Sequence, residues 1–173
     1  MKSNRTDTLL KVAIGLLAVL LIFFVSGTLQ QTVIEKNDTA PKFSIATDQG
    51  PNVGRSEFQG KLLVLNFWAS WCQPCLEEWP SLNDFAQRYK DKGVTVLAVS
   101  VDRNDKRYRD FLARNKPAFL TARDPDSNIS ASYGTFAYPE TYIIDRQGKV
   151  VFKIAQGQNW TDPAFLNYFQ SLL

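Results

Sequence analysis

The chain has 173 residues, of which 45% are hydrophobic and 21% are charged, which suffices for one well-packed domain and is short for two. It contains no histidine and only two cysteines. This composition excludes histidine-ligated metal sites, Ser-His-acid triads and haem attachment through Cys-x-x-Cys-His. Most of the net charge of +3 arises at the N-terminus, where Lys2, Arg5 and Lys11 outweigh Asp7, so the near-neutral remainder does not indicate nucleic-acid binding.

Residues 12–28 are uncharged and apolar enough to cross a membrane as a helix. The basic residues before them predict that residues 1–11 form a cytoplasmic tail and that the rest of the chain is extracytoplasmic. A cleaved signal peptide is the alternative, because small residues at 25–27 offer a cleavage position. The apolar run exceeds a usual signal core, which favours a retained anchor. Residues 29–40 are polar without periodicity, and we expect them to form a linker.

The following segment alternates between strand and helix patterns. Residues 42–47 indicate a short strand and 61–68 a buried strand. A helical stretch then runs to about Tyr89, and 94–101 indicate a second buried strand. This β-α-β unit implies a parallel pair joined by a crossover helix.

The C-terminal part adds further elements to the same sheet. The patterns predict a helix over 105–115, a short strand over 118–122, an antiparallel hairpin of 140–145 and 150–155 that turns at Gly148, and a final helix that opens at 161–163. The order β-α-β-α-β-α-β-β-α predicts an α/β domain with a mixed sheet covered by helices.

Both cysteines lie in the stretch FWASWCQPCLEEWP, residues 67–80, at the start of the first predicted domain helix. Residues three apart on a helix share a face, roughly 5 to 6 Å apart, so Cys72 and Cys75 can form and break a disulfide with little backbone movement. Cys72 is expected at the helix N-terminus, where free amides and the helix dipole stabilise a thiolate, and Pro74 fits the first turn. Cys75, one turn deeper, is expected to resolve the mixed disulfide formed by Cys72.

Two other interpretations of the cysteine pair are weaker. An inert bridge would close only a four-residue ring and would remove little entropy from the unfolded chain. A zinc site needs about four ligands, which two cysteines without histidine cannot supply within one chain. The comparison favours a redox-active dithiol.

The stretch LNFWASWCQPCLEEWP resembles the active-site strand, loop and helix of the thioredoxin superfamily, and Pro80 matches the proline that kinks its helix. The later stretch YGTFAYPETYIIDRQGKVVF, residues 133–152, resembles the membrane-anchored branch known as TlpA, ResA and CcmG (DsbE). The resemblance covers residues 41–173. It implies a thioredoxin-like fold there, with a central mixed sheet flanked by helices, and a reaction that needs no cofactor.

Several site residues follow from the resemblance. Pro139 would be a cis-proline facing the dithiol, and Tyr138 would offer backbone groups to an incoming peptide. Glu78 matches an acid that assists proton transfer, with a solvated charge as the alternative. Asn66 stands where many thioredoxins have a buried aspartate. Because asparagine cannot act as a base, proton transfer would depend on Glu78 and Glu140.

The aromatic residues around the dithiol divide into two groups. Phe67 and Trp68 are expected in the core. Trp71 abuts Cys72 and is expected to form an apolar rim that binds a partner. The loop between Thr121 and Tyr138 is a candidate lining of the same groove, and Glu140, the weaker acid, is expected to set the local charge.

The resemblance implies a membrane-anchored, extracytoplasmic protein-disulfide reductase that acts in cytochrome c maturation. Its substrates would be apocytochrome c Cys-x-x-Cys-His segments or a thiol partner, and a transmembrane electron donor of the CcdA/DsbD type would recharge it, because the outer compartment is oxidising. We expect a monomer.

Three alternatives remain beside this hypothesis. The chain resembles equally well those anchored relatives that reduce copper-site cysteines in oxidase assembly. A protein without catalytic activity, either a copper chaperone or a binding module, is the second alternative. Copper chaperones on this fold generally use Cys-x-x-x-Cys plus histidine, and this chain has neither. Peroxidase activity is disfavoured because the Thr-x-x-Cys pattern is missing from the corresponding loop.

Overall fold

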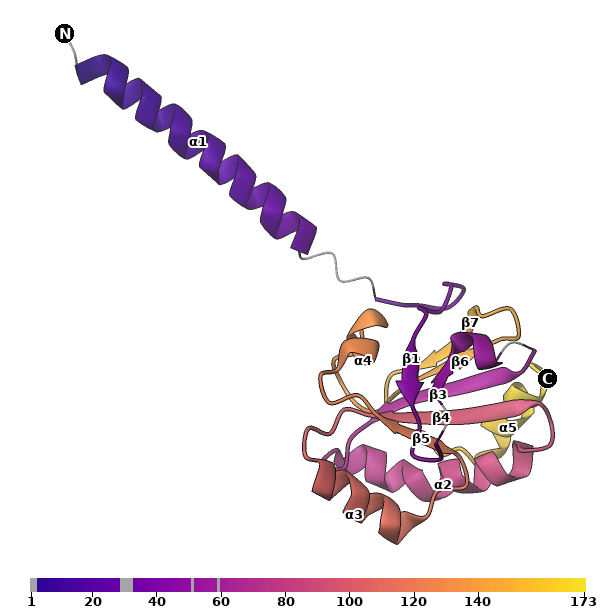
Figure 1. The fold of residues 1–173 in the computed structure, drawn as a ribbon. Coiled ribbons are helices and arrows are strands. Elements are labelled where there is room, and N and C mark those ends of the chain that lie inside the picture. Colours follow the sequence, from indigo (N-terminus) through magenta and orange to yellow (C-terminus); the bar gives the residue numbers. More distant parts are fainter. Residues whose placement is uncertain (1–2, 29–32, 51, 59) are drawn as a thin grey trace. The chain divides into compact units, whose positions relative to one another are not determined.

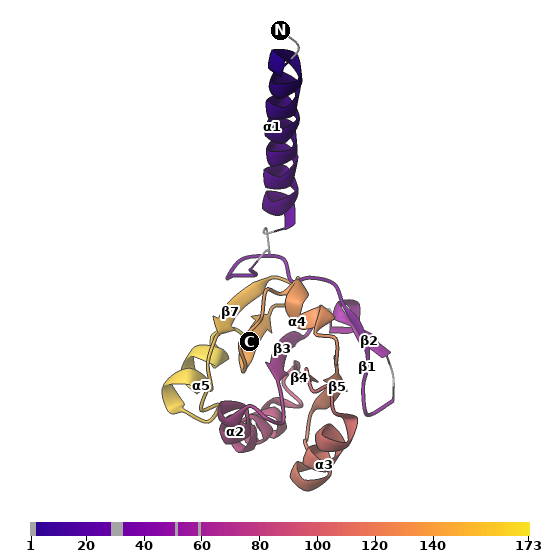
Figure 2. The ribbon, with the colours of Figure 1, turned by 90° about the vertical axis from the view of Figure 1, so that its left-hand side faces the viewer.

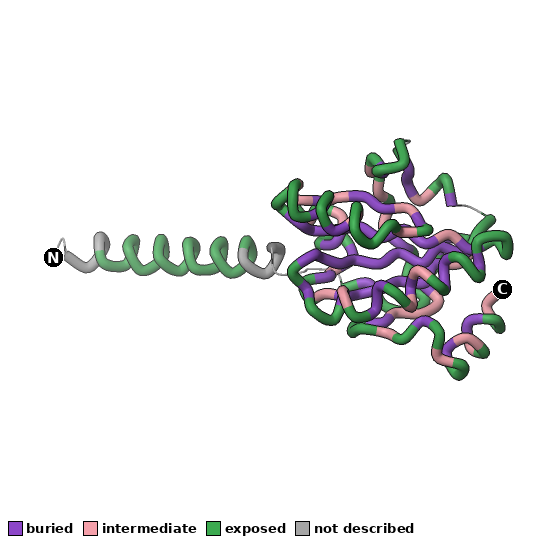
Figure 3. The backbone as a smooth tube through the Cα atoms, turned by 90° about the horizontal axis from the view of Figure 1, so that it is seen from below, coloured by how far each residue is buried: buried purple, intermediate pink, exposed green. Residues whose placement is uncertain are grey.

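The computed structural model describes residues 3–28, 33–50, 52–58 and 60–173, and the chain divides into two compact units, Met1–Thr32 and Val33–Leu173. The first unit is the helix α1, Ser3–Thr28 (Figure 1). Its stretch Asp7–Phe24 has a mean hydropathy of 2.3, is exposed along its length (Figure 3), and is long and apolar enough to cross a membrane. The predicted N-terminal apolar helix is therefore confirmed as a candidate membrane span.

The second unit is built on a five-stranded sheet with the order β5-β4-β3-β6-β7. Its strands are β3 (Leu62–Trp68), β4 (Val94–Ser100), β5 (Leu120–Arg123), β6 (Glu140–Ile144) and β7 (Val150–Ile154). β3 pairs with β4 and β4 with β5 in parallel, whereas β6 pairs antiparallel with both β3 and β7. The predicted mixed sheet is confirmed.

Four helices belong to this unit: α2 (Gln73–Tyr89), α3 (Asp105–Asn115), the short α4 (Asn128–Ser132) and α5 (Pro163–Gln170). α2 and α3 connect successive parallel neighbours in the same direction, so right-handed crossovers place them on one face of the sheet. α5 packs on that face too (Figure 2). Because β3 and β4 are parallel, α2 and α3 begin at the same edge of the sheet (Figure 1).

Each face of the sheet has its own hydrophobic core. The helical face packs Trp68 of β3 against Trp79 of α2 and Phe111 of α3. The other face is covered by the hairpin of β1 (Ser44–Ala46) and β2 (Asn52–Gly54), by the 3₁₀ helix η1 (Arg55–Phe58) and by α4. β3 is buried at all seven positions, which explains its continuous apolar sequence.

Some elements differ from the sequence-based expectation. β2 and η1 were not predicted, and the strand expected over 42–47 is the shorter β1. Residues 33–40, expected within a linker, belong to the second unit: Ile34 and Ala40 are buried, and the Ala40 amide donates to the Gly148 carbonyl at 3.0 Å. The compact unit thus begins nearer Val33 than Pro41, and the linker residues 29–32 lie outside the described residues.

Candidate active site

The two cysteines lie where β3 gives way to α2. Cys72 is the N-cap residue of α2, with φ −88° and ψ 104°, and Pro74 occupies the first turn. A disulfide joins Cys72 to Cys75, with Cα atoms 5.3 Å apart, and the Cys75 amide lies 3.3 Å from Cys72 Sγ. The Cys75 amide at the start of α2 therefore contacts the Cys72 sulfur, and the positive end of the helix dipole stabilises a thiolate there.

The outer face of the disulfide meets the loop that precedes β6. The carbonyl oxygen of Tyr138 lies 3.3 Å from Cys72 Sγ, and the peptide bond between Tyr138 and Pro139 is cis. Cys72 retains 5% of its exposure and Cys75 only 1%. The loop thus lies against Cys72, the more accessible of the two sulfurs.

An open groove of about 390 Å³ is lined by two neighbours of Cys72: Trp71, which precedes it in the chain, and Tyr138, whose carbonyl contacts its sulfur. We call it the Trp71 groove; it is lined by Trp71, Val101, Asp102, Arg103, Asn104, Arg107, Ser127 and Tyr138. Trp71 is 55% exposed and meets the Tyr138 ring edge-on, with centroids 6.0 Å apart. Phe67 and Trp68, by contrast, are fully buried. An exposed aromatic side chain beside a buried dithiol is suited to contact a partner.

Asp102 holds the chain just before the dithiol, a role that the sequence analysis missed. Its buried carboxylate accepts hydrogen bonds from the Ser70 amide and hydroxyl, both at 2.8 Å, and from the Ser100 hydroxyl at 2.7 Å. A signal for this contact exists, because Trp68 and Ser100 are partners in the parallel pair, and Ser70 and Asp102 each follow by two residues. Positions just beyond two parallel neighbours meet at one edge of a sheet.

Glu78 lies behind the dithiol, one turn after Cys75, and is 4% exposed. Its carboxylate accepts hydrogen bonds from Asn66 Nδ2 at 2.9 Å and from the Gln158 amide at 3.0 Å. Burial raises the pKa of Glu78 above its usual value, and these hydrogen bonds partly oppose the rise. The inward orientation, which sequence periodicity left open, thus makes Glu78 a carboxyl group that holds its proton more strongly than a solvated one.

Glu78 also borders a surface hollow. A hollow of about 770 Å³ lies between the first turns of α2 and residues 156–159, and Glu78 is among the residues that line it. Glu77, also on this hollow, is exposed and bonds Gln73, as expected for a solvated charge.

Glu140 directs its carboxylate into the domain. It is 8% exposed, accepts hydrogen bonds from Thr135 and Tyr142, and forms an ion pair with Lys153 at 3.4 Å. Lys153 also contacts Glu35 of the N-terminal segment at 3.0 Å. Glu140 is therefore part of an internal network beside Pro139, and its expected influence on substrate remains a prediction.

The described residues thus gather into one site from four places in the chain. Trp71, Cys72 and Cys75 lie at the start of α2, and Glu78 lies in its second turn. Tyr138 and Pro139 lie in the loop before β6. Asp102 follows the end of β4. The sequence predicted most of these residues; it did not identify Asp102 or the Gln158 amide, and Asn66 was not expected to bond Glu78.

Comparisons with known proteins agree with this arrangement. The AhpC/TSA family matches residues 37–153. The thiol-disulfide oxidoreductase ResA of Bacillus cereus is 32% identical over 164 residues, which cover 89% of this chain and 90% of the relative. The thioredoxin-like protein YneN of Bacillus subtilis is 33% identical over 145 residues, which cover 79% of this chain and 84% of the relative.

Solved structures give the same result. A crystal structure from Chlorobium tepidum, assigned as thiol:disulfide interchange protein DsbE, superposes with a TM-score of 0.74 at 32% identity, and the match covers 80% of this chain and 98% of that one. The resemblance to the thioredoxin superfamily and its ResA and DsbE branch is confirmed, and with it the prediction of an enzyme that exchanges protein thiols and disulfides.

Proposed function

The chain belongs to the AhpC/TSA family, and from this membership and the geometry of its dithiol we propose that the domain reduces disulfides in other proteins. One observation carries the proposal: Cys72 sits at the positive end of α2, faces the Tyr138 carbonyl, and has its partner Cys75 one turn deeper. An inert bridge would need neither the amide environment nor the adjoining groove.

The reaction proceeds in two exchanges. The Cys72 thiolate attacks one sulfur of a substrate disulfide, forms a mixed disulfide and releases the other substrate sulfur as a thiolate. Cys75 then loses its proton and attacks Cys72, which forms the Cys72–Cys75 disulfide and releases the second substrate thiolate. Two electrons pass from the dithiol to the substrate, and the disulfide seen here is the oxidised product.

Glu78 is the group that we assign to the proton of Cys75. The Cys75 thiol must lose a proton before it can attack, and a carboxyl whose pKa is raised by burial accepts protons more readily than a solvated one. The hollow beside Glu78 provides its exchange with solvent. On the substrate side, Trp71, Tyr138 and Pro139 hold the incoming peptide against Cys72, and Glu140 sets the charge behind that loop.

The apolar helix α1 supports a proposal for the cellular setting. We propose a cytoplasmic tail over 1–11, an anchor over 12–28, and an extracytoplasmic thioredoxin-like domain that continues to Leu173. In that setting the substrates are apocytochrome c disulfides or a thiol partner that passes electrons to them, and a transmembrane donor of the CcdA/DsbD type returns electrons to the dithiol. An oxidising compartment makes such a supply necessary.

Trapping tests this proposal. A Cys75→Ala variant of the full chain, expressed in membranes of its own cells, is expected to hold its substrate as a mixed disulfide that mass spectrometry identifies. If the trapped protein is apocytochrome c or its thiol partner, the proposed role is supported. If it is a protein with a copper site, the role is instead that of a reductant in oxidase assembly. Unchanged insulin-disulfide reduction by a Cys72→Ser variant would overturn the mechanism altogether.

A further inference from the structure

The charges around the Trp71 groove are arranged to favour one kind of substrate. Arg103 and Arg107 both line it and are both exposed, and neither forms an ion pair with any residue that the structure describes. The groove also borders Trp71 and Tyr138, which flank Cys72. Two arginines without an ion pair among the described residues therefore share one groove with the two aromatic residues next to Cys72.

Among the described residues, the acidic groups nearby form no ion pair with Arg103 or Arg107. The Asp102 carboxylate is 1% exposed and is occupied by three hydrogen bonds from Ser70 and Ser100. Asp105, the first residue of α3, is occupied by ion pairs with Arg109 at 2.7 Å and Arg123 at 3.2 Å. The exposed Asp126 precedes the lining residue Ser127 but does not itself line the groove.

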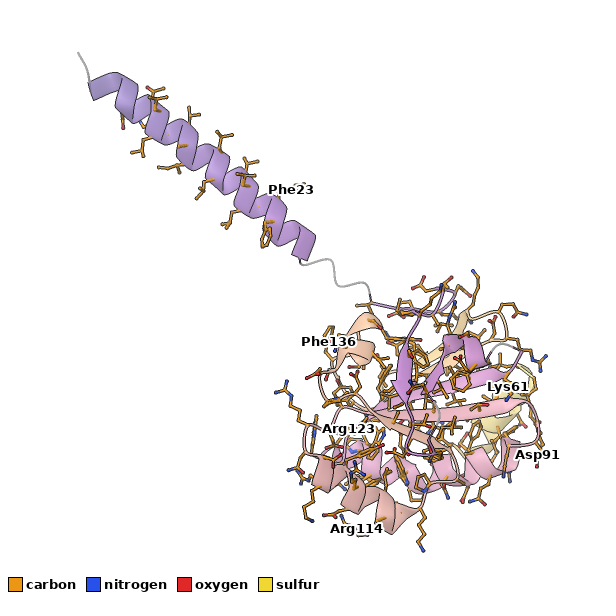
Figure 4. The ribbon with its side chains drawn as sticks, in the orientation of Figure 1. Phe23, Lys61, Asp91, Arg114, Arg123 and Phe136 are labelled. Atoms are coloured by element: carbon orange, nitrogen blue, oxygen red, sulfur yellow. A yellow bond between two sulfur atoms is a disulfide. The ribbon has the colours of Figure 1, made fainter. Side chains whose placement is uncertain are left out.

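The backbone adds to the positive potential. α3 is eleven residues long and begins at this groove, with Asn104 as its N-cap residue (Figure 1). The N-terminus of the helix, which has a partial positive charge, lies at the groove and adds to the positive charge of the two arginines. Arg123, labelled in Figure 4, lies near the start of α3 because it pairs with Asp105, whereas Arg114 lies at the other end of this helix.

We propose that the Trp71 groove selects polypeptide segments in which acidic side chains flank the disulfide to be reduced. This inference rests on the proposed reductase function and narrows its substrate class. Arginine binds carboxylates through two parallel N–H donors, and the aromatic pair of Trp71 and Tyr138 supplies the apolar contact beside the attacked sulfur. Electrostatic complementarity of this kind acts mainly on the rate of encounter and on the choice between partners.

The test compares matched peptides with the full chain in uncharged lipid nanodiscs. The peptides contain one Cys-x-x-Cys disulfide and differ only in their flanking residues, which are all aspartate, all asparagine or all lysine. We expect kcat/KM for the acidic peptide to exceed that for the neutral one by about tenfold at low salt, and the ratio to fall toward 1 at about 0.5 M salt, because screening shortens the range of the interaction. The lysine peptide should be the slowest.

Two variants locate the effect. Arg103→Gln combined with Arg107→Gln is expected to bring the acidic-to-neutral ratio close to 1. Arg88→Gln combined with Arg114→Gln removes the same charge from exposed positions near the C-terminal ends of α2 and α3, and should keep the ratio. Because each result is a ratio between two peptides on one protein, a general loss of activity does not imitate it.

The outcomes separate this inference from the function on which it rests. Equal rates for the three peptides, or a preference that survives the double substitution in the groove, would overturn the acidic preference and leave the reductase intact. Failure to reduce any of the three peptides would overturn the reductase assignment, and the preference with it.

Discussion

Asp102 provides the most specific structural prediction, because one buried carboxylate connects the ends of β3 and β4 to the dithiol. Asp102→Ala would remove three hydrogen bonds and leave the Ser70 amide and two buried hydroxyls without their acceptor. Hydrogen bonds to a charged group contribute about 1.5 to 3 kcal/mol each, and they are not fully additive. We therefore expect the free energy of unfolding to fall by about 4 kcal/mol, a large part of the about 5 to 15 kcal/mol that is usual for a domain.

Urea unfolding of the full chain in nanodiscs measures this loss. All four tryptophans lie in the second unit, so their fluorescence reports on that unit alone. Ser100→Ala is the matched control, since it removes one of the three hydrogen bonds to the carboxylate, together with the acceptor of the Asp102 amide, and should cost only about 2 kcal/mol. Hydrogen exchange at the Ser70 amide should accelerate in Asp102→Ala. A loss below about 1 kcal/mol, or no acceleration, would refute the role given to Asp102.

Three further predictions concern the two cysteines, Trp71 and Glu78. Cys75→Ala should accumulate a mixed disulfide on non-reducing gels whereas Cys72→Ser should form none, and equal trapping by both would contradict their assigned roles. Trp71→Ala should lower kcat/KM about tenfold on a peptide disulfide and far less on a small disulfide reagent, and equal losses would remove Trp71 from substrate binding. Burial raises the pKa of Glu78 above 4.5, so the native state binds more protons than the unfolded chain above that pH. The free energy of unfolding therefore falls as pH rises from 4.5 through the raised pKa; Glu78→Gln should abolish that contribution, and identical pH profiles for the two proteins would contradict it.

Elements with strong periodicity or continuous apolar runs could be predicted from the sequence. The helix α3 has the expected bounds, and β3 and β4 differ from the expected strands by one residue at an end. The N-terminal covering layer was harder to predict. Ile34 and Ala40 lie within a mostly polar segment without periodicity, and only their tertiary contacts reveal that they are buried. The short β2 likewise depends on its pairing with β1.

In the candidate site, too, residues with a local sequence pattern could be predicted and those that depend on tertiary contacts could not. The spacing of Cys72 and Cys75 identified the dithiol because it depends on one local helix start. The orientation of Glu78 could not be predicted, because Pro80 interrupts the helical pattern and because its partners Asn66 and Gln158 are distant in sequence. Such contacts arise from tertiary packing, which no local pattern records.

The difference in reactivity between the two sulfurs is the central claim, and selective alkylation tests it most directly. The reduced full chain is treated with iodoacetamide across a range of pH, and mass spectrometry quantifies the modification of each cysteine. Cys72 is expected to react first, already at a pH where free cysteine is largely protonated, while Cys75 remains protected. Equal, slow modification of both cysteines, with the pH dependence of free cysteine, would contradict the account.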